Sequence, residues 1–283
     1  MKQVLLLALF GGFFLSPTPG NKQKIFDVHL HGSSNVAAQL SALEKAGVYR
    51  AAISSSWEHQ NSYRGASGIR LLYGLMFPCP NGKVPYSLQH CYSNGQHWPA
   101  IDWVETQIKA GKIDFLGEVL SQYYGISSSD SLLSPYYALA EKYGLPVGIH
   151  TGGAGPDHGS PHFKWELGNP VYLEKLLSDF PRLNVWIMHA GDQYYREAIA
   201  IMKTHPRVYA DISVIANPAI VDHERFTTTM QQFMEAGLED RLMFGTDNGD
   251  VDKMVAAVQR LPFLSQQQKD KIFYGNAERF FSK

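Results

Sequence analysis

The chain has 283 residues, of which 45% are hydrophobic and 18% are charged, enough for one packed domain of enzyme size. Its 25 Lys and Arg residues nearly balance its 26 Asp and Glu residues, for a formal net charge of -1. No basic run is present that could neutralise a row of phosphates, so nucleic-acid binding is disfavoured, and no tract has the composition of a disordered chain.

The first twenty residues have the pattern of a bacterial-type signal peptide. Lys2 is followed by an apolar or glycine run over residues 4–15, and by small and helix-breaking residues up to Gly20. This run is about half of the roughly 20 residues that a membrane-spanning helix needs. We therefore expect residues 1–20 to be removed on export, to the periplasm or the medium, leaving no membrane span. An uncleaved anchor and a misassigned start are the alternatives.

Residues 24–283 are predicted to form one domain, in which eight runs with strand character alternate with helical patterns. The predicted strands are Ile25–His31, Tyr49–Ser54, Ile69–Phe77, Ile113–Val119, Pro146–His150, Asn184–His189, Val208–Ile212 and Leu242–Asp247. Helical patterns between them include Val36–Ala46, Leu132–Tyr143, Val171–Phe180 and Arg225–Ala236. Eight repeated βα units predict an α/β fold, a closed (β/α)₈ TIM barrel. No strand is followed by G-x-G-x-x-G, which argues against a dinucleotide fold.

Four connections that follow predicted strands are long, over residues 55–68, 77–99, 122–131 and 151–169. Active sites of barrels are built from such connections, so we expect these four to wall the pocket. Cys79 and Cys91, the only cysteines, both fall in the second connection. In an oxidising compartment they could close it with a disulfide, and two free thiols are an equal alternative because geometry decides the matter.

Histidine and aspartate side chains stand at the ends of several predicted strands. His29 and His31 alternate along the first strand and therefore share one face, toward the barrel interior. His150, His189 and Asp247 each end a later strand. Any one of them has an ordinary structural explanation. All five are metal ligands or acid–base groups, however, and the strand ends of a barrel converge, so their coincidence predicts one shared site.

The chain resembles the amidohydrolase superfamily, specifically the amidohydrolase-related branch of aminocarboxymuconate semialdehyde decarboxylase-like enzymes and lactonases. The resemblance spans about residues 24–283, and its carriers include Asp27-Val28-His29-Leu30-His31, Gly148-Ile149-His150-Thr151, His189-Ala190-Gly191, Val208-Tyr209-Ala210-Asp211-Ile212-Ser213 and Phe244-Gly245-Thr246-Asp247. It implies that His29, His31, His150 and Asp247 hold a divalent metal, and that His189 acts in proton transfer or substrate polarisation. Beside a metal-activated water, Asp247 is also an expected catalytic group, because its carboxylate can take the water's proton.

Two features vary among the members of that family: the group at the end of the fourth strand and the need for a metal. Glu118 ends the fourth strand, where some relatives with two metals place a bridging carboxylate or a carboxylated lysine. No lysine is available there, so Glu118 is either a further metal ligand or an ion-paired positioning group. Some lactonases of the branch work without a metal.

The expected activity is that of a metal-dependent hydrolase, with one zinc, manganese or similar cation. It would cleave an ester, lactone or amide bond of a small molecule through a metal-activated water. The alternatives are a non-oxidative decarboxylase of a carboxylated aromatic substrate and a secreted binding protein without turnover. Trp57, Arg64, Tyr123 and Trp165 are candidate substrate contacts, although each could simply pack a loop. A homo-oligomer is compatible with the sequence.

Overall fold

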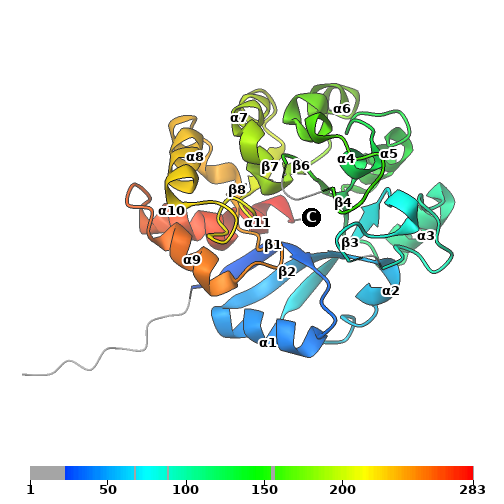
Figure 1. Ribbon diagram of the computed structural model, residues 1–283, viewed down its shortest axis with the longest axis horizontal. Helices are drawn as coiled ribbons and strands as arrows, with labels where there is room; N and C mark the ends of the chain where they lie inside the picture. The colour runs from blue at the N-terminus through cyan, green and yellow to red at the C-terminus, as the bar shows by residue number, and fades with distance from the viewer. Residues whose placement is uncertain (1–22, 67, 88, 154–156, 283) are drawn as a thin grey trace, which may run out of the picture.

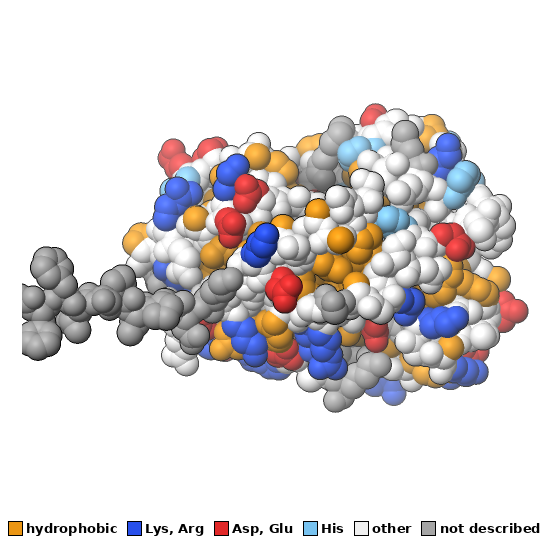
Figure 2. All heavy atoms as spheres, turned by 90° about the horizontal axis from the view of Figure 1, so that it is seen from below, with side chains coloured by type: hydrophobic (Ala, Val, Ile, Leu, Met, Phe, Trp, Pro, Cys, Tyr) orange, Lys and Arg blue, Asp and Glu red, His pale blue; other side chains and the backbone are white. Residues whose placement is uncertain are grey.

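The computed structural model describes residues 23–282 apart from positions 67, 88 and 154–156. The expected signal segment lies outside the described residues. Within them, no helix is both long enough and apolar enough to cross a membrane. Acidic and basic side chains are interspersed on the face of the molecule shown in Figure 2, in keeping with the net charge of -1.

Eight parallel strands form a single sheet in which each strand pairs with its neighbour in sequence. They are β1 (Ile25–His31), β2 (Val48–Ser55), β3 (Arg70–Phe77), β4 (Phe115–Val119), β5 (Val147–Ile149), β6 (Val185–Ile187), β7 (Val208–Asp211) and β8 (Leu242–Met243). The Val28 N–H donates to Phe244 O at 2.9 Å, and the Asp247 N–H donates to His29 O at 2.7 Å. These two bonds join β1 to the segment after β8, so the sheet is a nearly closed barrel, as predicted.

Most helices surround the barrel on its outer face, whereas the last one lies over the centre of the barrel in the view of Figure 1, next to the end of the chain. They are α1 (Val36–Ala46), α2 (Trp57–Gln60), α3 (Ile101–Lys109), α4 (Ser121–Tyr124), α5 (Ser134–Tyr143), α6 (Leu173–Asp179), α7 (Tyr195–Thr204), α8 (His223–Glu235), α9 (Val251–Gln259), α10 (Gln266–Asp270) and α11 (Asn276–Phe280). Helix α1 shows why helix bounds could be predicted from the sequence. The Asn35 side chain caps its first turn, and Gly47, at φ 100°, ends it.

Aromatic side chains fill part of the barrel interior. Phe26 of β1, Phe115 of β4 and Trp186 of β6 are fully buried in one cluster, together with Phe281, which follows α11. The Phe115 and Trp186 rings lie 5.4 Å apart between centroids, and the Phe26 and Phe281 rings lie 5.3 Å apart. The barrel is therefore a packed core rather than a pore, as is usual for this fold.

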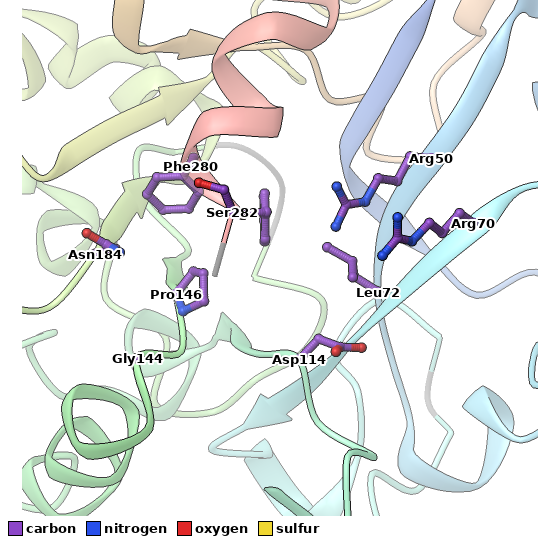
Figure 3. A pocket seen from close by; sticks show the side chains of 10 residues that line it. Arg50, Arg70, Leu72, Asp114, Gly144, Pro146, Asn184, Phe280 and Ser282 are labelled. Atoms are coloured by element: carbon purple, nitrogen blue, oxygen red, sulfur yellow. The ribbon is translucent and has the colours of Figure 1, made fainter.

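A pocket of about 320 Å³ lies near the amino ends of the strands (Figure 3). Arg50 of β2, Arg70 of β3 and Asp114, which precedes β4, line it, together with Phe280 and Ser282 near the end of the chain. In barrels of this type the chemistry is placed at the carboxyl ends of the strands. The pocket of Figure 3 is therefore at the wrong mouth of the barrel to be the candidate active site.

Candidate metal centre

The polar side chains predicted to share a site converge at the carboxyl ends of the strands. His29 and His31 come from β1 and Glu118 from β4, whereas His150 and His189 follow β5 and β6, and Asp247 comes four residues after β8. The four histidines and Glu118 are buried, with exposures from 1% to 5%. The structure thus brings all six residues of the predicted ligand and catalytic set together.

The two histidines of β1 face each other through their ring nitrogens, with His29 Nε2 and His31 Nε2 only 3.2 Å apart. His31 Nδ1 lies 2.9 Å from Ser54 O, and a carbonyl can only accept, so Nδ1 carries the hydrogen. His29 Nδ1 lies 3.1 Å from the Asp211 carboxylate and donates to it in the same way. In their neutral forms both Nε2 atoms therefore present lone pairs to one point, an arrangement that suits a cation bound between or beside them.

Glu118 lies among four imidazole rings. Its Oε1 is 2.6 Å from His150 Nδ1, 3.8 Å from His189 Nε2 and 3.9 Å from His29 Nε2, and its Oε2 is 3.4 Å from His31 Nε2. Burial alone would raise the pKa of this carboxyl, but His150 and the other imidazoles outweigh burial and hold the pKa well below its ordinary value. Glu118 is thus an ionised carboxylate at the centre of the cluster.

Asp247 reaches the site from a left-handed turn rather than from a strand. Asp247 and Asn248 have φ of 47° and 57°, a conformation that Asp and Asn tolerate better than most residues. The Asn248 side chain accepts from the His31 N–H at 3.0 Å and so ties the turn to β1. Asp247 Oδ1 consequently lies 3.0 Å from His31 Nε2. Burial opposes ionisation of Asp247, but when His31 also carries a hydrogen on Nε2, it donates to Asp247, and this hydrogen bond outweighs burial and lowers the pKa of Asp247.

Asp211, at the end of β7, is a residue in contact with the candidate site that sequence reasoning did not single out. It is fully buried, and its Oδ1 accepts from Ser213 Oγ at 2.6 Å. Because that hydroxyl hydrogen is used, Ser213 Oγ must accept from His189 Nδ1, which lies 2.9 Å away. Neutral His189 therefore also turns an Nε2 lone pair toward the site. The alternation of Asp211 and Ser213 at a strand end was the signal that could have revealed them.

The buried carboxylates favour positive charge in the site. Burial alone would lower the pKa of His29, but Asp211, with Asp247 and Glu118, raises it to about 10. The pKa of Asp211 is lowered to about 2, because its interaction with His29 outweighs burial. Neutral imidazole nitrogens and carboxylate oxygens are the ligands that zinc and similar cations prefer. The residues present therefore fit a divalent cation.

In the part of the chain that the structure describes, three overlapping groups of side chains could hold such an ion. In each, the candidate ligand atoms lie within 4.8 Å of one another. The groups are His29, His31 and Glu118; Glu118, His150 and His189; and His29, His189 and Asp211.

A cavity of about 530 Å³ opens beside this cluster and is lined in part by His31, Glu118, His150, His189 and Asp247. Side chains from three of the four long connections also line it: Tyr86, Tyr123 and His158. The connection over residues 77–99 is closed by a Cys79–Cys91 disulfide, which decides between the two alternatives left open by the sequence.

Of the four predicted substrate contacts, Tyr123 alone lines this cavity among the described residues. Trp57 instead packs against Trp103, at 4.8 Å between ring centroids. The Arg64 guanidinium lies over the Tyr73 ring, 4.1 Å from its centroid, and donates to Lys112 O. Trp165 is 43% exposed and is not part of the lining. These three residues therefore stay predictions as substrate contacts; contacts with Trp103 and Tyr73 hold the first two side chains outside this cavity lining.

Comparisons with known proteins agree with this architecture. An uncharacterised TIM-barrel protein from Bordetella bronchiseptica has a TM-score of 0.67 at 18% identity, covering 91% of this chain and 98% of that one. A probable 2-pyrone-4,6-dicarboxylic acid hydrolase from Acinetobacter baumannii has a TM-score of 0.61 at 15% identity, covering 91% and 99%. A 2,6-dihydroxybenzoate decarboxylase from Rhizobium has a TM-score of 0.60 at 12% identity, covering 92% and 98%.

Identities this low establish the fold alone, and no curated protein matches the chain. The model of the amidohydrolase family, however, matches residues 104–283, well over half of the chain. That segment contains Glu118, His150, His189 and Asp247, and β1 adds His29 and His31 from outside it. The chain therefore belongs to the amidohydrolase family.

Proposed function

We propose that this protein is a metal-dependent hydrolase that cleaves an ester, lactone or amide bond of a small molecule. The observation that carries the proposal is the pair of Nε2 lone pairs of His29 and His31, 3.2 Å apart beside Glu118 and Asp247 at the floor of a cavity. His29, His31, Asp247 and Glu118 would hold the cation, with His150 as a further ligand. Zinc is the expected ion, and manganese is a suitable substitute.

The cation would supply Lewis acidity, which polarises a substrate oxygen and eases deprotonation of a water molecule. The proton acceptor for that water is Asp247. Its lowered pKa keeps the carboxylate ionised at neutral pH, and it lines the cavity. An ionised carboxylate within reach of the reacting water is the requirement for a general base.

His189 is the candidate group for protonating the leaving group. The chain of hydrogen bonds from His189 through Ser213 to Asp211 keeps the hydrogen of the neutral ring on Nδ1. Nε2 therefore faces the cavity as an acceptor, and it becomes a donor only after it has taken up a proton. We infer that the proton that Asp247 takes from the water passes to His189 Nε2, and that His189 then delivers it to the leaving group.

The cavity favours an uncharged substrate. Among the described lining residues there is no Lys or Arg, whereas the carboxylates of Glu118 and Asp247 are present. Val214 and Ile220 add apolar surface, and Tyr123 adds an aromatic wall. Glu118 and Asp247 would offset the charge of the bound cation, so a free carboxylate elsewhere on the substrate would lose water without a compensating guanidinium among the described lining residues. A neutral ester, lactone or amide meets no such penalty.

The alternative is a metal-dependent non-oxidative decarboxylase. It is kept because a structure with the same fold is that of a 2,6-dihydroxybenzoate decarboxylase. In that reaction the substrate carboxylate would have to bind at the cation itself, since no described Lys or Arg lines the cavity. The two reactions differ in their products, which makes them separable in one assay.

The test is a substrate panel presented to zinc-loaded and manganese-loaded protein. Neutral lactones, esters and amides are followed by acid release, and dihydroxybenzoates are followed by carbon dioxide release. The proposal predicts acid release that is lost in the presence of a chelator and recovered on adding metal. Carbon dioxide release without any hydrolysis would select the decarboxylase. Metal binding without turnover of either class would select a binding protein.

A further inference from the structure

The loop over residues 79–91, which we call the disulfide loop, is a short hairpin joined at its base by Cys79 and Cys91. Within it, the Val84 N–H donates to Gln89 O at 2.8 Å and the Cys91 N–H donates to Gly82 O at 3.0 Å. Lys83 and His90 form an antiparallel bridge. The loop therefore has a defined shape, and Tyr86 lies near its tip.

The base of the disulfide loop is fixed to the barrel. Both cysteines are buried, at 0% and 1% exposure. The Cys79 N–H donates to His97 O, and Cys91 O accepts from the Trp57 N–H, each at 2.8 Å. A covalent link at the base, combined with these two anchors, limits the positions that the tip can take. Tyr86 and Ser87, near the tip, line the cavity beside the candidate metal centre.

The Tyr86 hydroxyl has an unusual hydrogen-bonding position. Its oxygen lies 2.8 Å from His31 Nδ1, the same nitrogen that donates to Ser54 O. Because Nδ1 carries a hydrogen, Tyr86 can only accept there, and its own hydrogen must point elsewhere. The nearest acceptors are Glu118 Oε2 at 3.5 Å, which is long for an O–H···O hydrogen bond, and Met76 Sδ at 3.6 Å, an ordinary distance for sulfur but a weak acceptor.

The Tyr86 hydroxyl is consequently a donor without a good partner in the protein, at the wall of the reaction cavity. A donor held in this way can meet a substrate oxygen as that oxygen gains negative charge. The His31 Nδ1–H donates to the Tyr86 oxygen and holds it in place, so the Tyr86 hydroxyl is oriented before substrate binds.

We propose that Tyr86 is a catalytic residue that donates a hydrogen bond to a substrate oxygen, and that the Cys79–Cys91 disulfide holds it in that position. The inference rests on the proposed hydrolase function, and it adds a residue and a covalent constraint to that site. It also gives the disulfide a role in turnover in addition to closing the loop.

The first variant is Tyr86→Phe, which removes the donor and keeps the ring. On a substrate that the parent hydrolyses, kcat is expected to fall about 100-fold while KM changes little, the scale for one lost transition-state donor. Zinc affinity should stay within about threefold, because Ser54 O still orients His31. The matched control is Tyr143→Phe, whose hydroxyl donates to Glu105 at 2.5 Å, remote from the cavity lining. It should retain the parent kcat.

The second variant is Cys79→Ala with Cys91→Ala, measured in the metal-loaded protein. Hydrogen exchange of the Val84 amide should become at least tenfold faster, a readout that needs no substrate. kcat should fall toward that of Tyr86→Phe, and adding Tyr86→Phe to the double variant should then lower kcat by less than threefold. Full additivity of the two effects would overturn the claim that the disulfide acts through Tyr86.

The outcomes separate this inference from the proposed function. If the parent hydrolyses a substrate and Tyr86→Phe retains its kcat, the role of Tyr86 is wrong while the hydrolase proposal stands. If the parent, loaded with zinc or manganese, hydrolyses nothing in the panel, the hydrolase proposal fails first and Tyr86 loses its role with it.

Discussion

Replacing Asp211 with Asn should weaken metal binding even though Asp211 need not touch the metal. Three donors surround its Oδ1: Ser213 Oγ at 2.6 Å, the Ser213 N–H at 3.0 Å and the His189 N–H at 3.1 Å. They will hold the oxygen of the new amide in that position. The amide nitrogen must then face His29 Nδ1, where Oδ2 of Asp211 lies 3.1 Å away.

Two N–H donors cannot face each other at that distance, so His29 must move its hydrogen from Nδ1 to Nε2. Its Nε2 would no longer present a lone pair beside His31 Nε2, which lies 3.2 Å from it. Loss of a partner that orients a ligating histidine typically lowers metal affinity about 10- to 100-fold, or about 1.4 to 2.7 kcal/mol. We expect Asp211→Asn to fall in this range.

The measurement is competition for zinc between the protein and a chromophoric chelator at pH 7.5, with circular dichroism to show that the variant is folded. Asp27→Asn is the matched control, because Asp27 is also fully buried but accepts from backbone and Thr246 donors and from no imidazole nitrogen. A folded Asp211→Asn protein that binds zinc within twofold of the parent would refute the tautomer argument.

Three further outcomes are expected. His29→Ala with His31→Ala should leave folded protein with less than a tenth of the parent zinc content by elemental analysis, and full retention would show that the ion binds elsewhere. Protein from its native host should be shortened near Gly20, because residues 4–15 fit a signal peptide; an intact Met1 in soluble cytoplasmic protein would contradict this. Cys79→Ala with Cys91→Ala should lower the free energy of unfolding by about 3 kcal/mol, measured in urea; an unchanged midpoint would count against a stabilising disulfide.

The barrel was predictable because its signals are local and repeated. The helix over Val36–Ala46 carries both a cap and a terminal glycine, and β1 was predicted at its observed bounds. Strand ends were less predictable: β8 was expected over Leu242–Asp247 but is limited to Leu242–Met243. The segment after Met243 still bonds to β1 but ends in a turn with positive φ at Asp247, and the sequence pattern does not report backbone conformation.

The side chains at strand ends could be predicted because topology alone brings them together. Loop side chains could not, since their direction depends on contacts that form only in the folded chain. Arg64 packs over the Tyr73 ring, and Trp57 packs against Trp103. Tyr86 was missed for the same reason, because only the path of the disulfide loop brings it to the site.

Asp27 provides a test of the electrostatics that is independent of metal and substrate. Burial raises the pKa of this carboxyl from 3.8 to about 6, although hydrogen bonds from Thr246 and from the His29 N–H oppose the change. A raised pKa means that the folded protein binds the proton more tightly than the unfolded chain. Protonated Asp27 therefore stabilises the folded state. This contribution is fully present below pH 3.8 and is lost as the pH rises through 6, a change of about 3 kcal/mol in the free energy of unfolding.

Asp27→Asn cannot titrate, so it should gain stability relative to the parent as the pH rises. Its amide oxygen can keep the two backbone donors of Asp27 Oδ1, the N–H groups of His29 and Thr246, each at 3.0 Å. The Thr246 hydroxyl can rotate to accept from the amide nitrogen. Urea unfolding of both proteins from pH 4 to pH 7, with a chelator present, should show the difference in unfolding free energy shifting by about 2.4 kcal/mol in favour of the variant. A difference that stays constant over that range would show that Asp27 is ionised in the folded protein throughout, and that its hydrogen bonds outweigh burial.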